Sequence, residues 1–196
     1  MARPDCDFFA ATMYSLIAQF LVEGFLNSSP HLLDTLMSTI FRTIEFLGLG
    51  IWLGSDVFLS FVVAPGAFGV LASRDQAGAI VGYSLARMHL LGIAAGVVVL
   101  LARLLRTRTM ASVTDLAALC VGLMILLTAV SQIAVSPKMA ALRVHMGSIQ
   151  ATAADSPLLA EFARLHRVSV TLESGVLLAG GAAMYFLVRE FAGRAG

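Results

Sequence analysis

The fold is decided by residues 42–65, RTIEFLGLGIWLGSDVFLSFVVAP, which are apolar enough to cross a lipid bilayer and yet contain two acids. Glu45 and Asp56 are eleven residues apart, which at about 100° per residue places both on one face of a helix. Trp52 falls on the same face. Asp56 lies eight residues before Ala64, so it is about 12 Å of helix inside the segment. An acid at that depth is costly in lipid and by default indicates a functional role.

Composition places the whole chain among the membrane proteins. It has 196 residues, of which 59% are hydrophobic and 13% are charged, against about 25% charged in a typical soluble domain. Apolar runs of about 20 residues recur, as expected of transmembrane helices. A net charge of +1 gives no reason to propose nucleic acid as a partner. Cys120 lies in an apolar run, where we expect a small residue facing lipid or the core.

Four segments have the length and composition of membrane spans. We predict spans at about 46–65, 86–105, 116–135 and 168–188, all within one membrane domain of residues 30–196. The predicted fold class is therefore all-α, an integral membrane four-helix bundle. The lipid bilayer is its first expected partner.

Residues 1–29 form a separate N-terminal segment. Within residues 7–26, apolar side chains recur at helical spacing on one face, with polar side chains on the others. We predict an amphipathic helix that lies in the membrane interface. The alternative is a first transmembrane span.

Short cap motifs predict where the helices start. Three Ser-Pro pairs have the pattern of a Ser N-cap followed by Pro in the first turn, and they predict helices that begin near Pro30, Pro137 and Pro157. Pro65 is expected to end or kink the first span. Ser112 with Asp115 is expected to open the third span.

A capping box and a line of glycines characterise the helix of the second span. Residues 73–76, SRDQ, have the S-x-x-Q form of a capping box, and the helix they open is predicted to run to about Leu105. Two small-xxx-small patterns follow, GAIVG and GIAAG, which allow close approach of another helix. His89 shares their face, which contains Gly78, Gly82, Gly92 and Gly96.

The orientation follows from the loop between the second and third spans. This loop, RLLRTRT at 103–109, is short and basic, which favours the cytoplasmic side. Both termini would then be cytoplasmic.

Antiparallel threading predicts a polar layer that no contiguous motif reveals. The first span exits the membrane where the second enters, and the third exits where the fourth enters. All four of these helix ends therefore share one side, on which lie Asp56, Arg87, His89, Gln132, His166 and Glu173. Glu173 is about 8 Å inside its span, so it could meet Asp56 in one layer of the bundle.

Three interpretations of this layer stay open. In the first, Arg87, Arg167 or a histidine neutralises the two acids, and the ion pairs fix the register of the helices. In the second, carboxylates and imidazoles form a cation or proton site. In the third, His89 is the axial ligand of a haem or another tetrapyrrole, for which the glycine face would leave room. No cofactor is required by the sequence.

The second interpretation includes a divalent metal. Carboxylates and imidazoles suit first-row divalent ions, and the candidate ligands are Asp56, His89, His166 and Glu173. No H-x-x-H or E-x-x-H spacing supports such a site.

Catalytic motifs are absent from the sequence: it has no G-x-S-x-G, no P-loop, no H-E-x-x-H and no C-x-x-C. We therefore predict a non-enzymatic protein. The first hypothesis is an accessory or structural subunit that packs against other membrane proteins or against itself, since the glycine patterns predict a packing seam. The alternatives are a small cation or metal transport or resistance protein, and a haem- or pigment-associated subunit.

Two stretches carry a family resemblance: FLGLGIWLGSDVFLSFVVAPGAF at 46–68 and VSPKM at 135–139. They are similar to the transmembrane-protein-205-like family of small four-span membrane proteins, whose bacterial branch is a domain of unknown function. The matching features are Trp52, Gly54, Pro65 and Pro137.

The resemblance covers roughly residues 40–190 and implies a four-span protein of the bacterial inner membrane. Animal members of that family are linked to platinum-drug resistance and vesicle traffic, a link that gives no function here. The first 40 residues lie outside the resemblance and could dock onto a partner.

Overall fold

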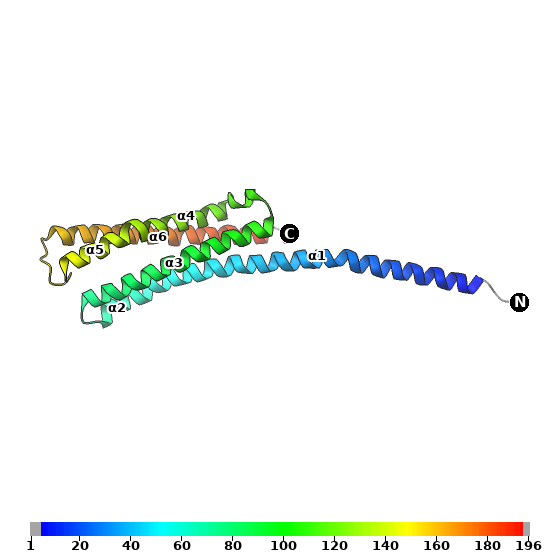
Figure 1. Ribbon diagram of the computed structural model, residues 1–196, viewed down its shortest axis with the longest axis horizontal. Coiled ribbons are helices and arrows are strands. Elements are labelled where there is room, and N and C mark those ends of the chain that lie inside the picture. Colours follow the sequence, from blue (N-terminus) through cyan, green and yellow to red (C-terminus); the bar gives the residue numbers. More distant parts are fainter. Residues whose placement is uncertain (1–4, 194–196) are drawn as a thin grey trace. The chain divides into compact units, whose positions relative to one another are not determined.

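The computed structural model describes the backbone of residues 5–193 and the side chains of residues 31–112 and 114–193. Every regular element in this part of the chain is helical, which confirms the predicted all-α class (Figure 1). The elements are α1 (Asp5–Phe58), η1 (Leu59–Val63), α2 (Ala64–Val70), α3 (Arg74–Thr107), η2 (Met110–Val113), α4 (Leu116–Val130), η3 (Ser131–Val135), α5 (Ser136–Met146) and α6 (Pro157–Ala192).

Four helical stretches are long and apolar enough to cross a membrane, and each contains one of the predicted spans. They are His31–Val70, Arg74–Thr107, Leu116–Met146 and Pro157–Ala192. The shortest has 31 residues and is about 46 Å long, which exceeds a hydrocarbon core of about 30 Å. The helices therefore extend beyond the bilayer, and the chain is an integral membrane helix bundle.

The chain divides into two compact units, Met1–Phe41 and Arg42–Gly196. The interfacial position predicted for residues 7–26 falls on side chains outside the described part, so it stays a prediction. The helix start expected near Pro30 is wrong, because α1 continues through this residue. A proline removes one backbone hydrogen bond but does not have to end a helix.

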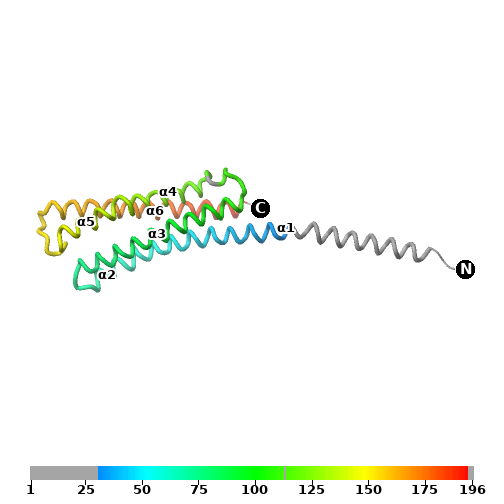
Figure 2. The backbone as a smooth tube through the Cα atoms, viewed as in Figure 1, coloured from blue at the N-terminus to red at the C-terminus, as the bar shows by residue number. Residues whose placement is uncertain are grey.

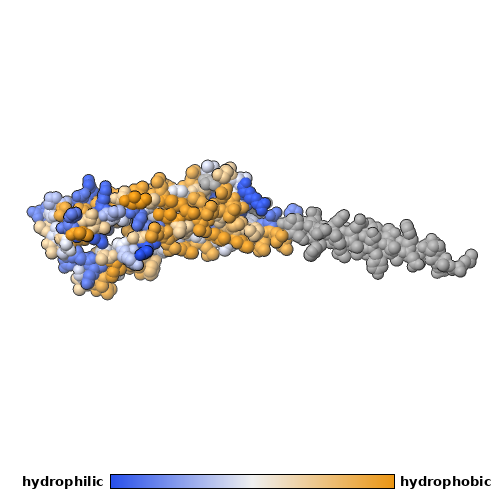
Figure 3. All heavy atoms as spheres, in the orientation of Figure 1, coloured by the Kyte–Doolittle hydropathy of each residue, from blue (hydrophilic) through white to orange (hydrophobic). Residues whose placement is uncertain are grey.

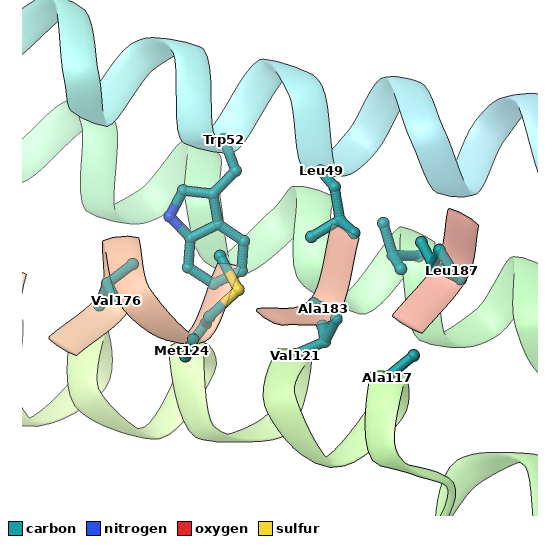
Figure 4. Close-up of a cluster of buried hydrophobic side chains, with 10 residues drawn as sticks. Leu49, Trp52, Ala117, Val121, Met124, Val176, Ala183 and Leu187 are labelled. Carbon is teal, nitrogen blue, oxygen red and sulfur yellow. The ribbon is translucent and has the colours of Figure 1, made fainter. Parts of the chain in front are cut away.

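In the second unit, α6 packs along α4, and α3 packs along α4 and α2. The tube in Figure 2 follows these helices back and forth, and α5 packs against α6. Trp52 of α1 and Met124 of α4 point toward each other in the apolar core (Figure 4). The core also contains Leu49, Val99, Ala117, Val121, Val176, Ala179, Ala183 and Leu187.

The outside of this unit is apolar as well. Phe61, Ile133 and Leu178 each expose 70% or more of their surface, and every long helix has exposed large apolar side chains. Figure 3 shows apolar side chains over the middle of the unit and polar side chains towards its ends. This is the pattern of a helix bundle whose lateral surface faces lipid.

The predicted starts of α3 and α6 are confirmed, and the predicted cap of α4 is corrected. Ser73 caps α3, where its Oγ accepts a hydrogen bond from the backbone N–H of Gln76 at 3.4 Å. The last long helix begins at Pro157. At α4 the cap is Asp115 alone, which accepts from the N–H of Ala118, whereas Ser112 lies in the preceding turn η2.

Pro65 and Pro137 each lie in the first turn of an α-helix, α2 from Ala64 and α5 from Ser136, so the start predicted near Pro137 is confirmed, although no break in the helical path precedes it. A π-turn precedes each of them, η1 before Pro65 and η3 before Pro137. In these turns the hydrogen bonds span five residues, from the Ala64 N–H to the Leu59 oxygen and from the Ser136 N–H to the Ser131 oxygen. The wider turn accommodates a residue that cannot donate, so the helical path continues into α2 and α5.

Candidate functional site

A cluster of polar side chains from all four long helices lies inside the bundle, near the two π-turns. We call it the polar cluster, and it contains Asp56 of α1, His89 of α3, Ser131 and Gln132 of η3 and Glu173 of α6. His89 Nε2 lies 2.6 Å from Oε1 of Glu173, and His89 Nδ1 lies 2.8 Å from Oε1 of Gln132. The Ser131 hydroxyl donates to the same Glu173 oxygen at 3.4 Å.

The acids of this cluster are incompletely satisfied. Asp56 is 0% exposed, and neither carboxylate oxygen has a hydrogen-bond partner within the described residues. Ser60, one turn further on, is near enough to interact with the carboxylate, as are His89 and Glu173. Glu173 Oε2 and the buried Thr128 Oγ1 are also without a partner in the described residues. Unpaired oxygens are expensive in a low-dielectric interior.

The π-turn η3 supplies two adjacent residues to the cluster. Ser131 is fully buried and contacts Glu173 on α6, while Gln132 contacts His89 on α3. Neighbouring residues of a helix point in directions about 100° apart, so they reach different neighbours. π-turns within α-helices are often found at functional sites.

At the other end of the same helices, side chains of opposite charge pair with one another. We call this set the arginine network, which consists of Glu45, Arg103, Arg106, Asp115 and Glu190. Arg103 donates to Glu45 at 3.2 Å, to Glu190 at 2.7 Å and to Asp115 from Nε at 2.9 Å. Arg106 donates to Glu45 at 2.7 Å and to Glu190 at 3.2 Å.

The arginine network was not recognised from the sequence as a unit. In the sequence, Arg103 and Arg106 indicate the orientation and Glu45 marks a helix face, and no local pattern joins the three. The antiparallel order of the spans also places the start of the first span beside the end of the second. Glu45 and Arg103 could therefore have been predicted to lie close together.

The two sets are well separated along the bundle. Arg103 follows His89 by fourteen residues along α3, which is about 21 Å of helix. The apolar core around Trp52 lies between them. If the arginine network marks one edge of the bilayer, the polar cluster lies about two thirds of the way through a 30 Å hydrocarbon core.

The glycine face of α3 is filled from within the chain. A Cβ atom added to Gly92 would lie 2.4 Å from Nε1 of Trp52, and one added to Gly96 would lie 2.5 Å from its Cζ3. This overturns the room expected there for a macrocycle beside His89, because the indole of α1 already occupies it. Both ring nitrogens of His89 are also engaged.

The other two glycines of this face, Gly78 and Gly82, lie against the side chain of Arg143 on α5. Added Cβ atoms at Gly78 and Gly82 would each lie 3.2 Å from the guanidinium of Arg143. Arg143 Nη1 donates to the Gly78 carbonyl at 2.7 Å, and its guanidinium lies over the ring of Phe162 at 5.4 Å. The glycine seam therefore packs against α1 and α5 of the same chain.

Two members of the predicted layer do not join the polar cluster. Arg87 is exposed, with its guanidinium 5.2 Å from the ring centroid of Tyr83. His166 is exposed because the inward face of α6 runs through Leu165 and Ser169, and His166 points about 100° away from Leu165. Arg167 is exposed too, so neither arginine neutralises the acids, and of the partners named in the first interpretation only a histidine, His89, contacts Glu173.

A divalent metal gains no support from the arrangement. Among the described residues, no group of three or more His, Cys, Asp or Glu is placed to hold a metal ion. With His166 outside the cluster, the predicted ligand set is reduced to Asp56, His89 and Glu173. His89 would have to give up one of its two hydrogen bonds to bind a metal.

Comparisons with known proteins identify the chain only at the level of a family. No curated protein and no solved structure matches it. A family model described as a domain of unknown function (DUF4149) matches residues 47–148, which include Trp52, Asp56, His89 and Gln132. The resemblance to the transmembrane-protein-205-like family is not supported beyond this domain. The chain belongs to the DUF4149 family.

Proposed function

We propose that this protein is a non-enzymatic membrane protein that binds a small cation in the polar cluster and moves it across the bilayer. The observation that carries the proposal is Asp56, a carboxylate that is completely buried and has no hydrogen-bond partner among the described residues. A buried acid of this kind is costly as an anion, and in membrane proteins such residues mark ion pathways.

The alternative of purely structural ion pairing fits the polar cluster less well than the arginine network. In the arginine network each of the three acids pairs with a guanidinium. In the polar cluster three carboxylate oxygens, both of Asp56 and Oε2 of Glu173, have no partner in the described part of the chain. Helix register would be better served by apolar residues than by unpaired acids.

Ion sensitivity of cells provides the test. Cells that lack the native protein are complemented with the wild-type chain, Asp56→Asn or Glu173→Gln, and growth is compared across a series of metal, sodium and proton concentrations. We expect both variants to abolish the effect of the protein on ion sensitivity at unchanged abundance. Asp155→Asn is the control, because Asp155 is exposed. Loss of abundance instead would favour a structural role.

A second candidate is an accessory subunit that packs against other membrane proteins or against a second copy. Gly50 and Gly54 favour it, since both lie on the exposed side of α1 with no atom within 4 Å of an added Cβ. Glycines one turn apart let another transmembrane helix approach closely. The seam of α3 does not support this candidate, because Trp52 and Arg143 already fill it.

Gentle detergent extraction of the tagged protein tests the second candidate. A partner in fixed ratio, lost in a Gly50→Leu and Gly54→Leu variant, would support a subunit role. A monomer that co-purifies with nothing contradicts it. Gly122→Leu is the matched control on α4, where an added side chain also meets open space.

A further inference from the structure

We infer that the cation taken by the polar cluster is a proton, and that His89, Glu173 and Asp56 hold it. This builds on the proposed function and names the species that the site handles. The hydrogen bonds of the histidine carry the inference.

Both ring nitrogens of His89 face oxygen atoms that accept hydrogen bonds. Nδ1 lies 2.8 Å from the amide oxygen of Gln132, and Nε2 lies 2.6 Å from a carboxylate oxygen of Glu173. An amide oxygen never donates, and neither does an ionised carboxylate. When Glu173 is ionised, a ring that donates from both nitrogens is an imidazolium, and His89 and Glu173 then form a buried ion pair.

The ion pair explains why Asp56 is left without a partner. The charged groups that act on His89 are Glu173 from α6 and Asp56 from α1, while η3 presents only the neutral Ser131 and Gln132. One imidazolium balances one of the two carboxylates. Asp56 therefore carries its own proton when the site is filled, because the acid form needs no counter-charge.

A metal ion fits the same site poorly. A bound cation would sit next to the imidazolium, and like charges at short range repel strongly in a low-dielectric interior. Binding through His89 would require loss of the hydrogen bond to Gln132 or to Glu173. A proton avoids both problems, since it can be taken up and released by groups that are already in place.

Proton exchange at the site needs only water as a further reactant. When Asp56 gives up its proton, its O–H bond breaks and an O–H bond forms on a water molecule, which becomes hydronium and leaves Asp56 as an anion beside the imidazolium of His89. When the Nε2–H bond of His89 breaks and an O–H bond forms on Glu173 Oε1, the ion pair becomes a neutral imidazole and a neutral acid. Each step breaks one bond to hydrogen and forms another, so only protons move and no group is oxidised or reduced.

The protonation state can be measured on the resting protein. His31, His145 and His166 are all exposed, so replacing them by His31→Gln, His145→Gln and His166→Gln leaves His89 as the only histidine. We expect nitrogen-15 spectra of this protein in lipid vesicles to show two protonated ring nitrogens at neutral pH. In the same background, Glu173→Gln is expected to leave one. A single N–H in the otherwise unaltered site would overturn the inference.

Transport in vesicles separates this inference from the proposed function. The purified full chain is reconstituted with a trapped pH dye, and a potassium diffusion potential, negative inside, is applied with valinomycin. We expect proton uptake faster than in protein-free vesicles, a loss of that excess in Asp56→Asn and Glu173→Gln, and no loss in Asp155→Asn.

The alternative outcomes differ in what they reject. Uptake of sodium or of zinc without protons would leave the proposed function standing and would overturn the proton assignment. If protons, sodium and zinc all fail to move, both fall. Proton uptake that persists in Asp56→Asn and Glu173→Gln would assign the transport to another part of the chain.

Discussion

The polar cluster and the arginine network both connect helices of the bundle through buried charged groups, but they satisfy those groups differently. In the arginine network two guanidinium groups hold three carboxylates, and Glu45, although only 1% exposed, contacts both of them. In the polar cluster one histidine faces two acids, and Asp56 at 0% exposed has no hydrogen bond within the described residues.

The difference separates charges that hold the structure from charges that are available for chemistry. Mutual attraction and hydrogen bonds offset the desolvation of charged groups in the arginine network, so removing one member leaves the others unpaired. Asp56 has no hydrogen bond in the described structure, so replacing it by the neutral Asn, which has the same shape, breaks no such contact. Different effects on stability are therefore expected at the two sites.

The largest loss of stability is expected from Arg103→Ala. This change leaves Glu45, Asp115 and Glu190 short of a positive charge, and removing one partner from a buried ionic set typically costs about 3–5 kcal/mol. Thermal unfolding in detergent measures the effect. Arg189→Ala, which removes an exposed arginine near the same end of the bundle, is the control. Equal melting temperatures for the two variants would show that the network does not hold the helices together.

The comparison is sharpest for a pair of acid-to-amide changes. Glu45→Gln weakens hydrogen bonds to two guanidinium groups and should lower the free energy of unfolding by about 1.5–3 kcal/mol, the range for bonds to charged groups. Asp56→Asn replaces a group that has no hydrogen bond in the described structure by one of the same shape, so the free energy of unfolding should change little. Denaturant titration of both variants measures the two free energies of unfolding. A larger loss for Asp56→Asn would contradict the distinction between the two sites.

A smaller loss is expected where Trp52 meets α3, between the two sites. Gly92→Ala places a methyl group against the indole and should cost about 1–3 kcal/mol through overpacking. Gly122→Ala has open space around the new methyl group and should be neutral or stabilising, since alanine favours a helix. Melting temperatures of the two variants test this packing, and similar values would contradict it.

The smallest effect is expected from His166→Ala, because this histidine is exposed and lies outside the polar cluster. His89→Ala removes the partner of Glu173 and should lower both stability and any ion-dependent function. Growth under ion stress and abundance in membranes measure the two. Loss of function in His166→Ala at normal abundance would show that this residue belongs to the functional site.

Hydrophobic periodicity and cap motifs were sufficient to predict much of the fold. The four spans, the Ser73 cap and the start at Pro157 depend on local chain chemistry, and all three were predicted from the sequence. The start near Pro137 was also predicted, although a π-turn joins α5 to the helix before it. The start at Pro30 was wrong, because a proline restricts only its own turn and does not have to end a helix.

The sequence by itself determined that acids and histidines lie at similar depths in antiparallel spans. Helical rise and the order of the spans fix depth, which is why Asp56, His89, Gln132 and Glu173 were predicted in one layer and are found together. Only the tertiary structure decided which side chains turn inward, since small rotations of α3 and α6 leave Arg87 and His166 exposed. It also decided that Trp52 fills the glycine face and that Asp56 is left without a partner, because both depend on contacts between helices that are far apart in sequence.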